Sequence, residues 1–278
     1  MSTLSGKVAV VTGAGRPGGL GAAIVSRLAT LGCTVVLSDV GASSDAALPA
    51  AMIGTQSQMD RTADAIRAAT GAQLATFACD VRDPQRVDAL AALAVDRFGS
   101  LDIWVNNAGI GYLMQPLLEV GVEQWRAVLD VNLTGCFHGI QAAARRMIAA
   151  GRGGRIINIA SQAAKSGFPF AAAYCASKHG LVGLVRSVAI ELGPHGITVN
   201  NVCPNHVTTG LGAWQNEYFA TRLGLTREQY LERMRERIPL RRPGLPEDTA
   251  AAVAFLCSPE AAYITAESMN VSGGEEPH

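Results

Sequence analysis

The sequence predicts an α/β fold in which helices cover both faces of one parallel sheet of about seven strands. Short runs of β-branched residues alternate with longer segments of helical character along the whole chain. The short runs are apolar at consecutive positions, which is typical of strands buried on both faces. Hydrophobic residues make up 49% of the chain and charged residues 17%, so a large core can form. Parallel strands joined by helices imply right-handed crossovers.

The individual elements follow from these patterns in chain order. In the first half we expect strands at 7–12, 33–39, 72–80 and 101–109 and helices at 20–32, 61–71 and 84–99. In the second half we expect helices at 123–151, 173–193 and 246–258 and strands at 155–162, 197–204 and 267–274. No internal repeat, linker or low-complexity tract interrupts them, which predicts a single domain over residues 1–278.

Two segments fit neither pattern. Residues 40–58 are small and polar, and residues 205–243 mix aromatic with charged side chains. Irregular segments of such length in a compact domain usually have a function. We expect residues 205–243 to form a lid over a substrate. Three of its aromatic residues, Trp214, Tyr218 and Phe219, either contact the substrate or pack the segment onto the body.

Composition and charge argue against several classes of function. Lys plus Arg and Asp plus Glu number 23 each, so nothing favours a nucleic-acid partner. The six cysteines are scattered without a CxxC pair, which argues against structural zinc and disulfides and fits a reducing compartment. The N-terminus lacks a signal-peptide pattern, and no window reaches the roughly 18 apolar residues of a membrane span. We expect a cytoplasmic protein with no metal and no membrane partner.

A glycine-rich segment, TGAGRPGGLG, joins the first expected strand to the first expected helix. Gly13, Gly19 and Gly21 permit close backbone approach, and a helix beginning near Leu20 offers free amides to a pyrophosphate. Asp39 ends the second strand, 20 residues beyond Gly19, where a carboxylate would bind the adenosine ribose of a dinucleotide. Alone, the segment would be an ordinary turn and Asp39 a helix cap. Together they predict a nucleotide site.

The stretch AYCASKHG places Tyr174 and Lys178 four positions apart, on one face of a helix. In isolation this pair would be a buried tyrosine beside a lysine whose stem packs against it. With its context, the chain resembles the short-chain dehydrogenase/reductase family from Gly6 to Gly274. The matching positions are Thr12, Gly13, Gly19, Leu20, Gly21, Asp80, Val81, Asn106, Asn107, Ala108, Gly109, Asn132, Ser161, Tyr174, Lys178, Pro204, Thr209, Gly273 and Gly274.

The resemblance implies a Rossmann fold with strand order 3-2-1-4-5-6-7 and a bound dinucleotide. The residues expected to contact that cofactor are Gly13, Gly19, Leu20, Gly21, Asp39, Asp80, Val81, Asn107, Ala108, Gly109, Tyr174, Lys178, Pro204, Val207 and Thr209. Among these, the family pattern implies that Asp80 contacts the adenine and that Val207 and Thr209 contact the nicotinamide carboxamide or the phosphates.

The resemblance also implies that Asn132, Ser161, Tyr174 and Lys178 carry the catalysis. Ser161 would hydrogen-bond the substrate oxygen, and Asn132 would bend its helix and hold a water that links Lys178 to solvent. Free tyrosine titrates near about 10, and a lysine about 4 Å away would lower its pKa by roughly 3 units. Tyr174 would then exchange a proton with the substrate near neutral pH while a hydride passes between substrate and cofactor.

We therefore expect an NAD-dependent oxidoreductase that interconverts a secondary alcohol and its ketone. The helices at 123–151 and 173–193 have apolar faces that predict a homotetramer or a dimer. Two alternatives remain. Arg16 could approach a 2′-phosphate, which would favour an NADPH-dependent carbonyl reductase. A regulator that binds NAD but has lost catalysis is disfavoured because all four catalytic residues are present.

The chain departs from the family pattern in ways that affect loop geometry. Five residues, AGRPG, separate TG from GLG where the family has three, and Pro17 has no amide to donate. Asn205 stands where glycine is usual, and Ala266 and Ser272 stand where glycine and aspartate are common. None of these changes removes a catalytic group.

Other residues near the expected site have simpler interpretations. His206 is expected to make a local hydrogen bond and Cys175 to pack. Phe168 and Phe170, just after Ser161, are candidates for an apolar pocket wall. The charged run at 227–237 is expected to be a solvated helix face.

Overall fold

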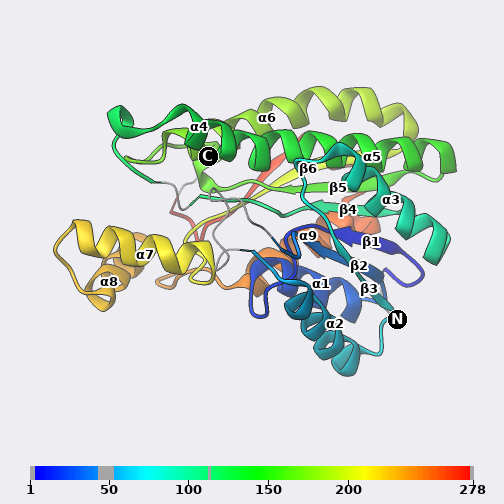
Figure 1. The fold of residues 1–278 in the computed structure, drawn as a ribbon, viewed down its shortest axis with the longest axis horizontal. Coiled ribbons are helices and arrows are strands. Elements are labelled where there is room, and N and C mark those ends of the chain that lie inside the picture. Colours follow the sequence, from blue (N-terminus) through cyan, green and yellow to red (C-terminus); the bar gives the residue numbers. More distant parts are fainter. Residues whose placement is uncertain (1–3, 43–52, 112–113, 276–278) are drawn as a thin grey trace.

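The computed structural model describes residues 4–42, 53–111 and 114–275, and a seven-stranded parallel sheet forms its centre (Figure 1). The strands are β1 (Val8–Val11), β2 (Thr34–Asp39), β3 (Leu74–Ala78), β4 (Ile103–Asn106), β5 (Gly154–Ile159), β6 (Ile197–Pro204) and β7 (Ser268–Val271). Their order in the sheet is β3-β2-β1-β4-β5-β6-β7. The fold class and the strand order expected from the sequence are confirmed.

Helices cover both faces of the sheet (Figure 1). One layer contains α1 (Leu20–Thr30), α2 (Gln56–Thr70) and α9 (Pro246–Cys257), and the other contains α3 (Pro84–Phe98), α4 (Val122–Leu129), α5 (Gly135–Ala150) and α6 (Ala172–Leu192). Two further helices, α7 (Leu211–Arg222) and α8 (Arg227–Arg237), stand outside both layers. They lie beside the carboxyl edge of the sheet, where parallel α/β folds build their sites.

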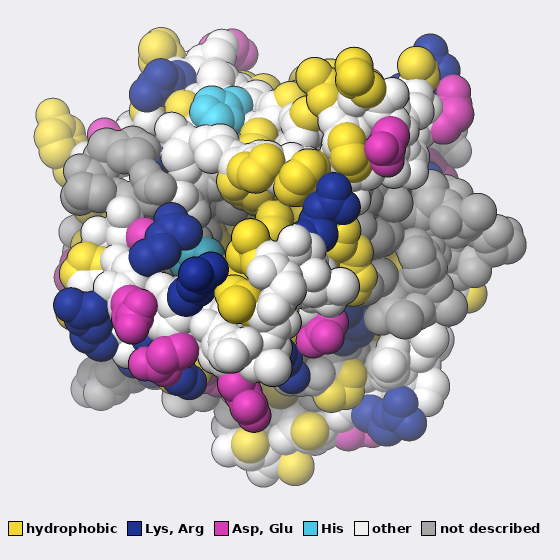
Figure 2. Space-filling model, turned by 90° about the vertical axis from the view of Figure 1, so that its left-hand side faces the viewer, with side chains coloured by type: hydrophobic (Ala, Val, Ile, Leu, Met, Phe, Trp, Pro, Cys, Tyr) yellow, Lys and Arg dark blue, Asp and Glu magenta, His cyan; other side chains and the backbone are white. Residues whose placement is uncertain are grey.

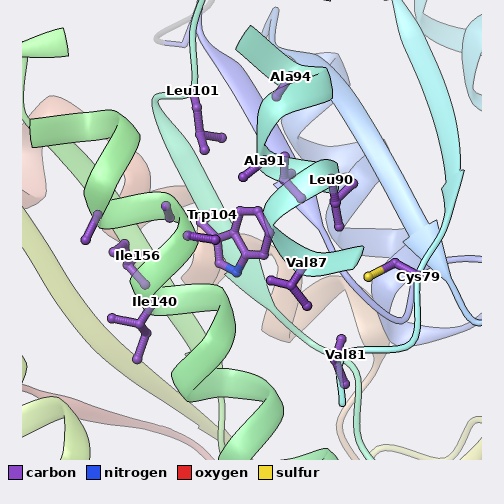
Figure 3. Close-up of a cluster of buried hydrophobic side chains, with 14 of the residues drawn as sticks. Cys79, Val81, Val87, Leu90, Ala91, Ala94, Leu101, Trp104, Ile140 and Ile156 are labelled. Atoms are coloured by element: carbon purple, nitrogen blue, oxygen red, sulfur yellow. The ribbon is translucent and has the colours of Figure 1, made fainter. Parts of the chain in front are cut away.

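The two helical layers bury separate hydrophobic clusters against the sheet. Because successive strand residues point to opposite faces, Val8 and Val10 join the cluster under α3, α5 and α6, whereas Ala9 and Val11 join the cluster under α1 and α9. Trp104 of β4 is fully buried at the centre of the first cluster (Figure 3). Strands buried on both faces explain the continuous apolar runs in the sequence.

Three side-chain amides and one hydroxyl form a row across the neighbouring strands β4, β5, β6 and β7. Asn106, Asn158, Asn201 and Ser268 occupy paired positions in that order. Asn106 Nδ2 donates to Asn158 Oδ1 at 2.8 Å, and Asn158 Nδ2 donates to Asn201 Oδ1 at 3.2 Å. Asn201 Nδ2 donates to Ser268 Oγ at 3.0 Å. Buried amides that satisfy one another hold the strand ends in register directly below the site.

The helix expected at 123–151 is divided by a π-helical turn, Asp130–Thr134. Asn132, in the middle of this turn, is fully buried. Its Nδ2 donates a hydrogen bond to the Ile110 carbonyl, and its Oδ1 accepts one from the Ile110 backbone amide, each 2.8 Å long. A π-helical turn inserts an extra residue in the helix and is frequent at functional sites. The sequence prediction that Asn132 bends its helix is therefore consistent with this turn.

The two irregular segments are more ordered than the sequence suggested. α2 begins at Gln56 rather than at position 61, because Thr55 and Gln58 form a reciprocal capping box. The remainder of that segment, residues 43–52, lies outside the described residues. Residues 205–243 contain both α7 and α8. No helix in the described part of the chain is long and apolar enough to cross a membrane.

Candidate active site

A cavity of about 660 Å³ opens at the carboxyl edge of the sheet. Every residue that the sequence assigned to the cofactor lies in its wall: Gly13, Gly19, Leu20, Gly21, Asp39, Asp80, Val81, Asn107, Ala108, Gly109, Tyr174, Lys178, Pro204, Val207 and Thr209. Ser161 lies in the same wall, whereas Asn132 does not. Figure 2 looks onto the side of the molecule where α7 and α8 lie, and hydrophobic side chains gather at the centre of this face.

The glycine-rich loop is braced against the end of β4. Gly13 has φ +65°, and a Cβ there would lie 2.6 Å from the Cα of Ala108. Asn107 Nδ2 donates to the carbonyls of Thr12 and Gly13, both at 2.9 Å. In return, Thr12 Oγ1 accepts the amides of Asn107 and Ala108 at 3.1 Å. The loop therefore has a fixed shape, and a ligand can approach its backbone closely.

The N-terminus of α1 completes this cradle. Gly19 is its N-cap residue and has no side-chain capping bond. A Cβ at Gly21 would lie 2.5 Å from the Gly13 carbonyl oxygen, so only glycine lets the helix approach the loop this closely. Exposed amides at the positive end of a helix favour a pyrophosphate. The residues present therefore fit a dinucleotide.

Asp39, at the end of β2, has a structural function that the sequence did not reveal. Its Oδ2 accepts the amide of Gly15, and its Oδ1 accepts the amides of Val40 and Gly54, all at 2.9 Å. A Cβ at Gly54 would lie 2.6 Å from Asp39 Oδ2, so the chain passes close to the carboxylate. Asp39 thus holds the glycine-rich loop and the approach to α2 together. Its expected ribose contact stays a prediction.

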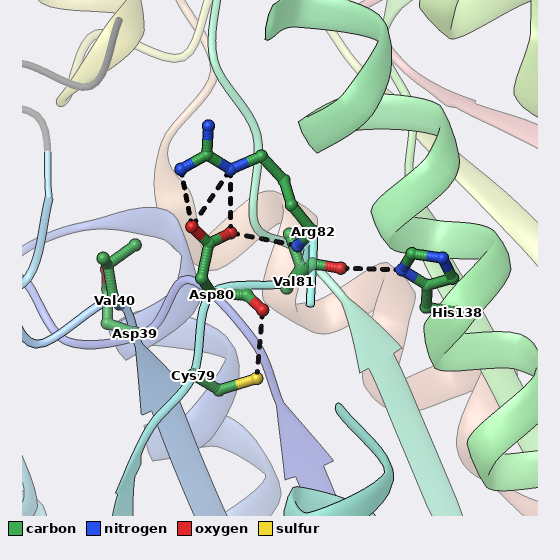
Figure 4. A network of polar contacts seen from close by, with 7 residues as sticks. All are labelled: Asp39, Val40, Cys79, Asp80, Val81, Arg82 and His138. Carbon is green, nitrogen blue, oxygen red and sulfur yellow. Dashed lines mark hydrogen bonds and ion pairs between the residues drawn. The ribbon is translucent and has the colours of Figure 1, made fainter. Parts of the chain in front are cut away.

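Asp80 is paired with Arg82 where the chain leaves β3 (Figure 4). Arg82 Nε lies 3.0 Å from both carboxylate oxygens, and its terminal nitrogen lies 2.6 Å from Oδ2. The neighbouring Val81 carbonyl bonds His138 Nδ1 of α5 at 3.1 Å. These contacts fix this part of the cavity wall. The expected contact between Asp80 and adenine remains untested.

Tyr174 and Lys178 share one face of α6, as their spacing predicted. Lys178 Nζ donates to the Ile159 carbonyl at 2.8 Å and lies 5.7 Å from the centre of the Tyr174 ring. Burial raises the pKa of Tyr174 to about 12, although a hydrogen bond with Ser161 opposes this shift. Burial also lowers the pKa of Lys178. The expectation that Lys178 brings the tyrosine pKa towards neutrality is therefore wrong, because burial dominates the shift of this pKa.

Asn132 supports the site from behind the cavity wall. Besides its bonds to Ile110, its Nδ2 lies 3.1 Å from Ser177 Oγ of α6. A Cβ at Gly109 would lie 3.3 Å from Asn132 Oδ1 and 3.7 Å from Lys178 Nζ, so both polar groups reach the same glycine. Asn132 holds the chain after β4 against α6. Its expected role of holding a water that links Lys178 to solvent stays a prediction.

The comparisons with known proteins agree with this geometry. A family model described as enoyl-(acyl carrier protein) reductase matches residues 13–276. A short-chain dehydrogenase/reductase from Armillaria gallica is 37% identical over 98% of this chain and 97% of its own length. This chain belongs to the short-chain dehydrogenase/reductase family.

Solved structures of the family show the same architecture. Carveol dehydrogenase from Mycobacterium avium, in complex with NAD, superposes with a TM-score of 0.90 at 32% identity and covers 99% of both chains. A variant of actinorhodin polyketide ketoreductase with NADPH gives a TM-score of 0.88 at 35% identity, with 100% of both chains covered. The protein is a short-chain oxidoreductase that uses NAD(P) and acts on alcohols or ketones.

The remaining wall of the cavity comes from the β5–α6 connection, from α7 and α8, and from the segments around His206 and Glu275. Phe168 and Phe170 of the β5–α6 connection line it, as expected, and Phe219 of α7 faces them. Trp214 and Tyr218 stack on one another at 5.2 Å and are not part of the wall. Of Trp214, Tyr218 and Phe219, only Phe219 therefore lines the cavity.

The expectation that residues 227–237 form a solvated helix face holds for most of α8 but not for two of its residues. Although most of this helix is exposed, Tyr230 and Arg237 line the cavity together with His206 and Glu275. Glu275 carries no periodic or motif signal in the sequence, because its position depends on contacts with Asn205, 70 positions earlier. Tertiary contacts of this kind leave no local pattern.

Proposed function

We propose that this protein catalyses the NAD-dependent interconversion of a secondary alcohol and its ketone, with Tyr174 as the general acid and base. The observation that carries the proposal is the shared cavity. It connects the glycine cradle at Gly13 and Gly21 with the side chains of Ser161, Tyr174 and Lys178. A cofactor site alone would suit many enzymes, but a proton-transfer group beside it suits hydride chemistry at a carbinol carbon.

Each of these side chains has a defined task. The nicotinamide supplies or accepts the hydride when the cofactor is bound. Ser161 hydrogen-bonds the substrate oxygen and shares a hydrogen bond with Tyr174. Tyr174 gives its phenolic proton to the carbonyl oxygen in reduction and takes the carbinol proton in oxidation. Lys178, oriented by the Ile159 carbonyl, places a positive charge near the phenolate that oxidation requires.

The raised pKa of Tyr174 affects the two directions differently. A tyrosine that keeps its proton up to high pH is a ready acid for ketone reduction. Alcohol oxidation needs the phenolate, so its rate should rise with pH. Both directions use the same residues, since the forward and reverse reactions pass through one transition state.

NAD is the cofactor that the site favours within this proposal. The Asp39 carboxylate lines the cavity and would repel a 2′-phosphate, which has about two negative charges. The Arg16 guanidinium lies against Gly210, where an added Cβ would be 3.1 Å from its terminal nitrogen. The second candidate, an NADPH-linked carbonyl reductase, draws support from the actinorhodin ketoreductase with NADPH and from Arg16 in the cavity wall.

A spectrophotometric assay of NADH formation with a panel of secondary alcohols tests the proposal. We expect turnover with NAD and much less with NADP. Binding of NAD without turnover of any alcohol or ketone would favour the silent regulator instead. The carveol dehydrogenase relative makes cyclic secondary alcohols the first members of the panel.

The segment from Asn205 to Pro243 is proposed to act as a lid. α7 and α8 lie outside the two helical layers and contribute Phe219 and Tyr230 to the cavity wall. Hydrogen exchange across residues 210–225 should slow when cofactor and substrate are both present. Unchanged exchange would mean that these helices only pack against the body.

A homotetramer is proposed for the assembly, with a dimer as the alternative. The layer that contains α4, α5 and α6, together with the turn before α4, exposes large apolar side chains, including Leu118, Val122, Phe137 and Ile190. Exposed apolar surface of this extent favours association. Light scattering at micromolar concentration should give the mass of four chains, and a monomeric mass would contradict the proposal.

A further inference from the structure

One face of α7 lines the cavity, and that face ends in an arginine. Gly212, Gln215, Phe219 and Arg222 all belong to the cavity wall and follow one another at intervals of three or four residues. Residues at this spacing lie on the same side of a helix. Arg222 is the last residue of α7 and is exposed, so a molecule that enters the cavity can reach its guanidinium.

Two aromatic rings hold the Arg222 side chain at the cavity. Its Cζ lies 4.2 Å from the centre of the Phe170 ring and 5.5 Å from the centre of the Tyr218 ring. Phe170 belongs to the β5–α6 connection and lines the cavity, so Arg222 reaches from the lid to another part of the wall. A guanidinium that stacks on a ring keeps its N–H donors in its own plane, where a carboxylate can accept two parallel hydrogen bonds.

Phe170 itself has an unusual backbone conformation. Its φ is +70°, in the left-handed region that bulky residues rarely adopt. Its carbonyl accepts the backbone amide of Gln115 at 3.0 Å, which helps to hold this conformation. Strained backbone of this kind is concentrated at active sites and at segments that clamp a ligand. The contact between Phe170 and Arg222 is therefore placed where a ligand contact is expected.

The charge of Arg222 is not compensated. Two carboxylates of the cavity wall already have an arginine partner, since Asp80 pairs with Arg82 and Glu275 pairs with Arg237. Among the described residues, no ion pair and no hydrogen bond involves the Arg222 side chain. A cation in the last turn of a helix is favourable in itself, but this position alone does not require a contact across the cavity wall. The wall at the end of α7 therefore favours an anionic ligand group.

Arg222 lies at the end of α7 that is remote from the glycine-rich loop. At the other end, a Cβ added to Gly210, the N-cap residue, would lie 3.1 Å from a terminal nitrogen of Arg16. The 12 residues of α7 extend for roughly 18 Å. The positive charge of Arg222 is therefore available to a substrate rather than to a pyrophosphate at the loop.

Aromatic contacts relate Arg222 to the catalytic tyrosine. The ring centre of Phe168 lies 6.5 Å from that of Tyr174 and 6.1 Å from that of Phe219. Arg222 follows Phe219 by three residues, which is roughly 4.5 Å further along the axis of α7. An anion bound at Arg222 is therefore separated from the reacting carbon by an aromatic part of the wall, and an apolar spacer has to connect the two groups.

We propose that Arg222 is a specificity-determining residue that binds a carboxylate of the substrate. The substrate class is then a hydroxy acid, or the matching keto acid, in which an apolar spacer separates the reacting carbinol from the carboxylate. Phe168 and Phe219 contact the spacer, while Ser161 and Tyr174 hold the reacting oxygen. This inference rests on the proposed alcohol dehydrogenase function.

Matched pairs of a carboxylate and its uncharged primary amide test the inference. 4-(1-Hydroxyethyl)benzoate is compared with 4-(1-hydroxyethyl)benzamide, and 7-hydroxyoctanoate with 7-hydroxyoctanamide, at saturating NAD and low salt. The carboxylate should have a kcat/KM at least about fivefold higher in at least one pair, mainly through a lower KM, because the ion pair lies away from the reacting atoms. The advantage should shrink at about 0.5 M salt, because exposed charges are screened.

Two results would overturn the inference: equal kcat/KM within both pairs, or no turnover of any of the four compounds. In either case the proposed function stands if the enzyme oxidises the uncharged secondary alcohols of the panel described above. If those alcohols are not turned over either, both proposals are rejected.

The variant Arg222→Gln assigns the preference to the guanidinium. It removes the charge, so the preference for the carboxylate should fall to about twofold or less. The preference is a ratio measured within one variant, so a general loss of activity does not change it. Arg227→Gln, which removes an exposed arginine of α8 outside the cavity wall, should keep the wild-type preference. A preference that survives in Arg222→Gln, or that falls equally in both variants, would overturn the assignment.

Discussion

The Lys178 ammonium lies 5.7 Å from the centre of the Tyr174 ring and donates its hydrogen bond to the Ile159 carbonyl at 2.8 Å. This places a positive charge beside the phenol while the backbone fixes the lysine orientation. The free-energy balance at Tyr174 is nevertheless dominated by burial, which raises its pKa to about 12. Tyr174 therefore keeps its proton at neutral pH, and the Lys178 ammonium lies close enough to stabilise the phenolate when it forms.

Replacing Tyr174 by Phe removes the transferable proton and keeps the ring. We expect kcat to fall by about 10²–10⁴-fold, the usual contribution of a positioned acid–base group. The dissociation constant of NAD, measured by titration calorimetry, should change only a few-fold. Tyr263→Phe, at a fully exposed position, is the matched control and should keep wild-type turnover. Activity of Tyr174→Phe close to wild type would contradict the mechanism.

A second prediction concerns Gly139 of α5, which lies against the polar end of Trp104. Trp104 Nε1 donates to Asn106 Oδ1 at 2.6 Å. A Cβ at Gly139 would overlap that oxygen most closely and would lie 2.5 Å from the nitrogen. Gly139→Ala should therefore lower the free energy of unfolding by about 1–3 kcal/mol, despite the better helix propensity of alanine. Denaturant unfolding measures this difference.

The control for this variant is another helical glycine. A Cβ at Gly183 of α6 meets nothing within 4 Å, so Gly183→Ala should be neutral or stabilising by up to about 1 kcal/mol. Equal effects of the two substitutions would show that the contact with the hydrogen-bonded pair of Trp104 and Asn106 has no energetic consequence.

Most of the fold could be predicted because its causes are local. Strands such as β1 and β4 are short runs buried throughout, and glycines mark the loop at Gly13 and the entry to α1. The division of the helix at Asp130–Thr134 could not be predicted in the same way. It depends on Asn132 bonding to Ile110, 22 positions earlier. The capping box of Thr55 and Gln58 was present in the sequence but lay in a segment taken as irregular.

The parts of the candidate site that follow family motifs could be predicted from the sequence. The parts that depend on the packing of this chain could not. The residues of the expected cofactor cradle and the Tyr174–Lys178 pair converge on one cavity. The electrostatics were not predictable, because burial of Tyr174 is a property of the packed structure. The hydrogen bonds from Gly54 to Asp39 and from Asn205 to Glu275 could not be predicted either, because both join distant segments of the chain.

A third prediction follows from the buried thiols. Burial raises the pKa of Cys33 and of Cys79 to about 12. An unfolded thiol titrates near about 8.5, so above that pH the unfolded chain binds fewer protons than the folded one. The free energy of unfolding should therefore decrease between roughly pH 9 and pH 12, by up to about 1.4 kcal/mol per pH unit for each thiol.

Urea unfolding at pH 7.5 and at pH 10, in the presence of reductant, measures this decrease. The double variant Cys33→Ala and Cys79→Ala should lose less stability over the same interval, because the two shifted groups are gone. The difference between the two proteins isolates these thiols from other groups that titrate near pH 10. Identical losses would contradict the prediction.

Gly54, whose amide donates a hydrogen bond to Asp39, provides a control for the prediction that Asp39 determines the preference for NAD over NADP. A Cβ at Gly54 would lie 2.6 Å from Asp39 Oδ2, so Gly54→Ala disturbs the same contact without removing the charge. It should lower stability while the preference between NAD and NADP persists. This variant separates the structural function of Asp39 from its effect on cofactor choice.

The last prediction concerns Asp39 itself. A 2′-phosphate would place about two negative charges near this carboxylate, and a cost of roughly 3 kcal/mol corresponds to more than a hundredfold. Wild-type kcat/KM should therefore favour NAD over NADP by at least about two orders of magnitude. Asp39→Ala should narrow this gap by weakening NAD binding and relieving repulsion of the phosphate. It also leaves the buried amides of Gly15 and Gly54 without their acceptor, so the melting temperature should fall as well. Equal use of NADH and NADPH by the wild-type enzyme would show that Arg16 outweighs Asp39 and would favour the carbonyl reductase.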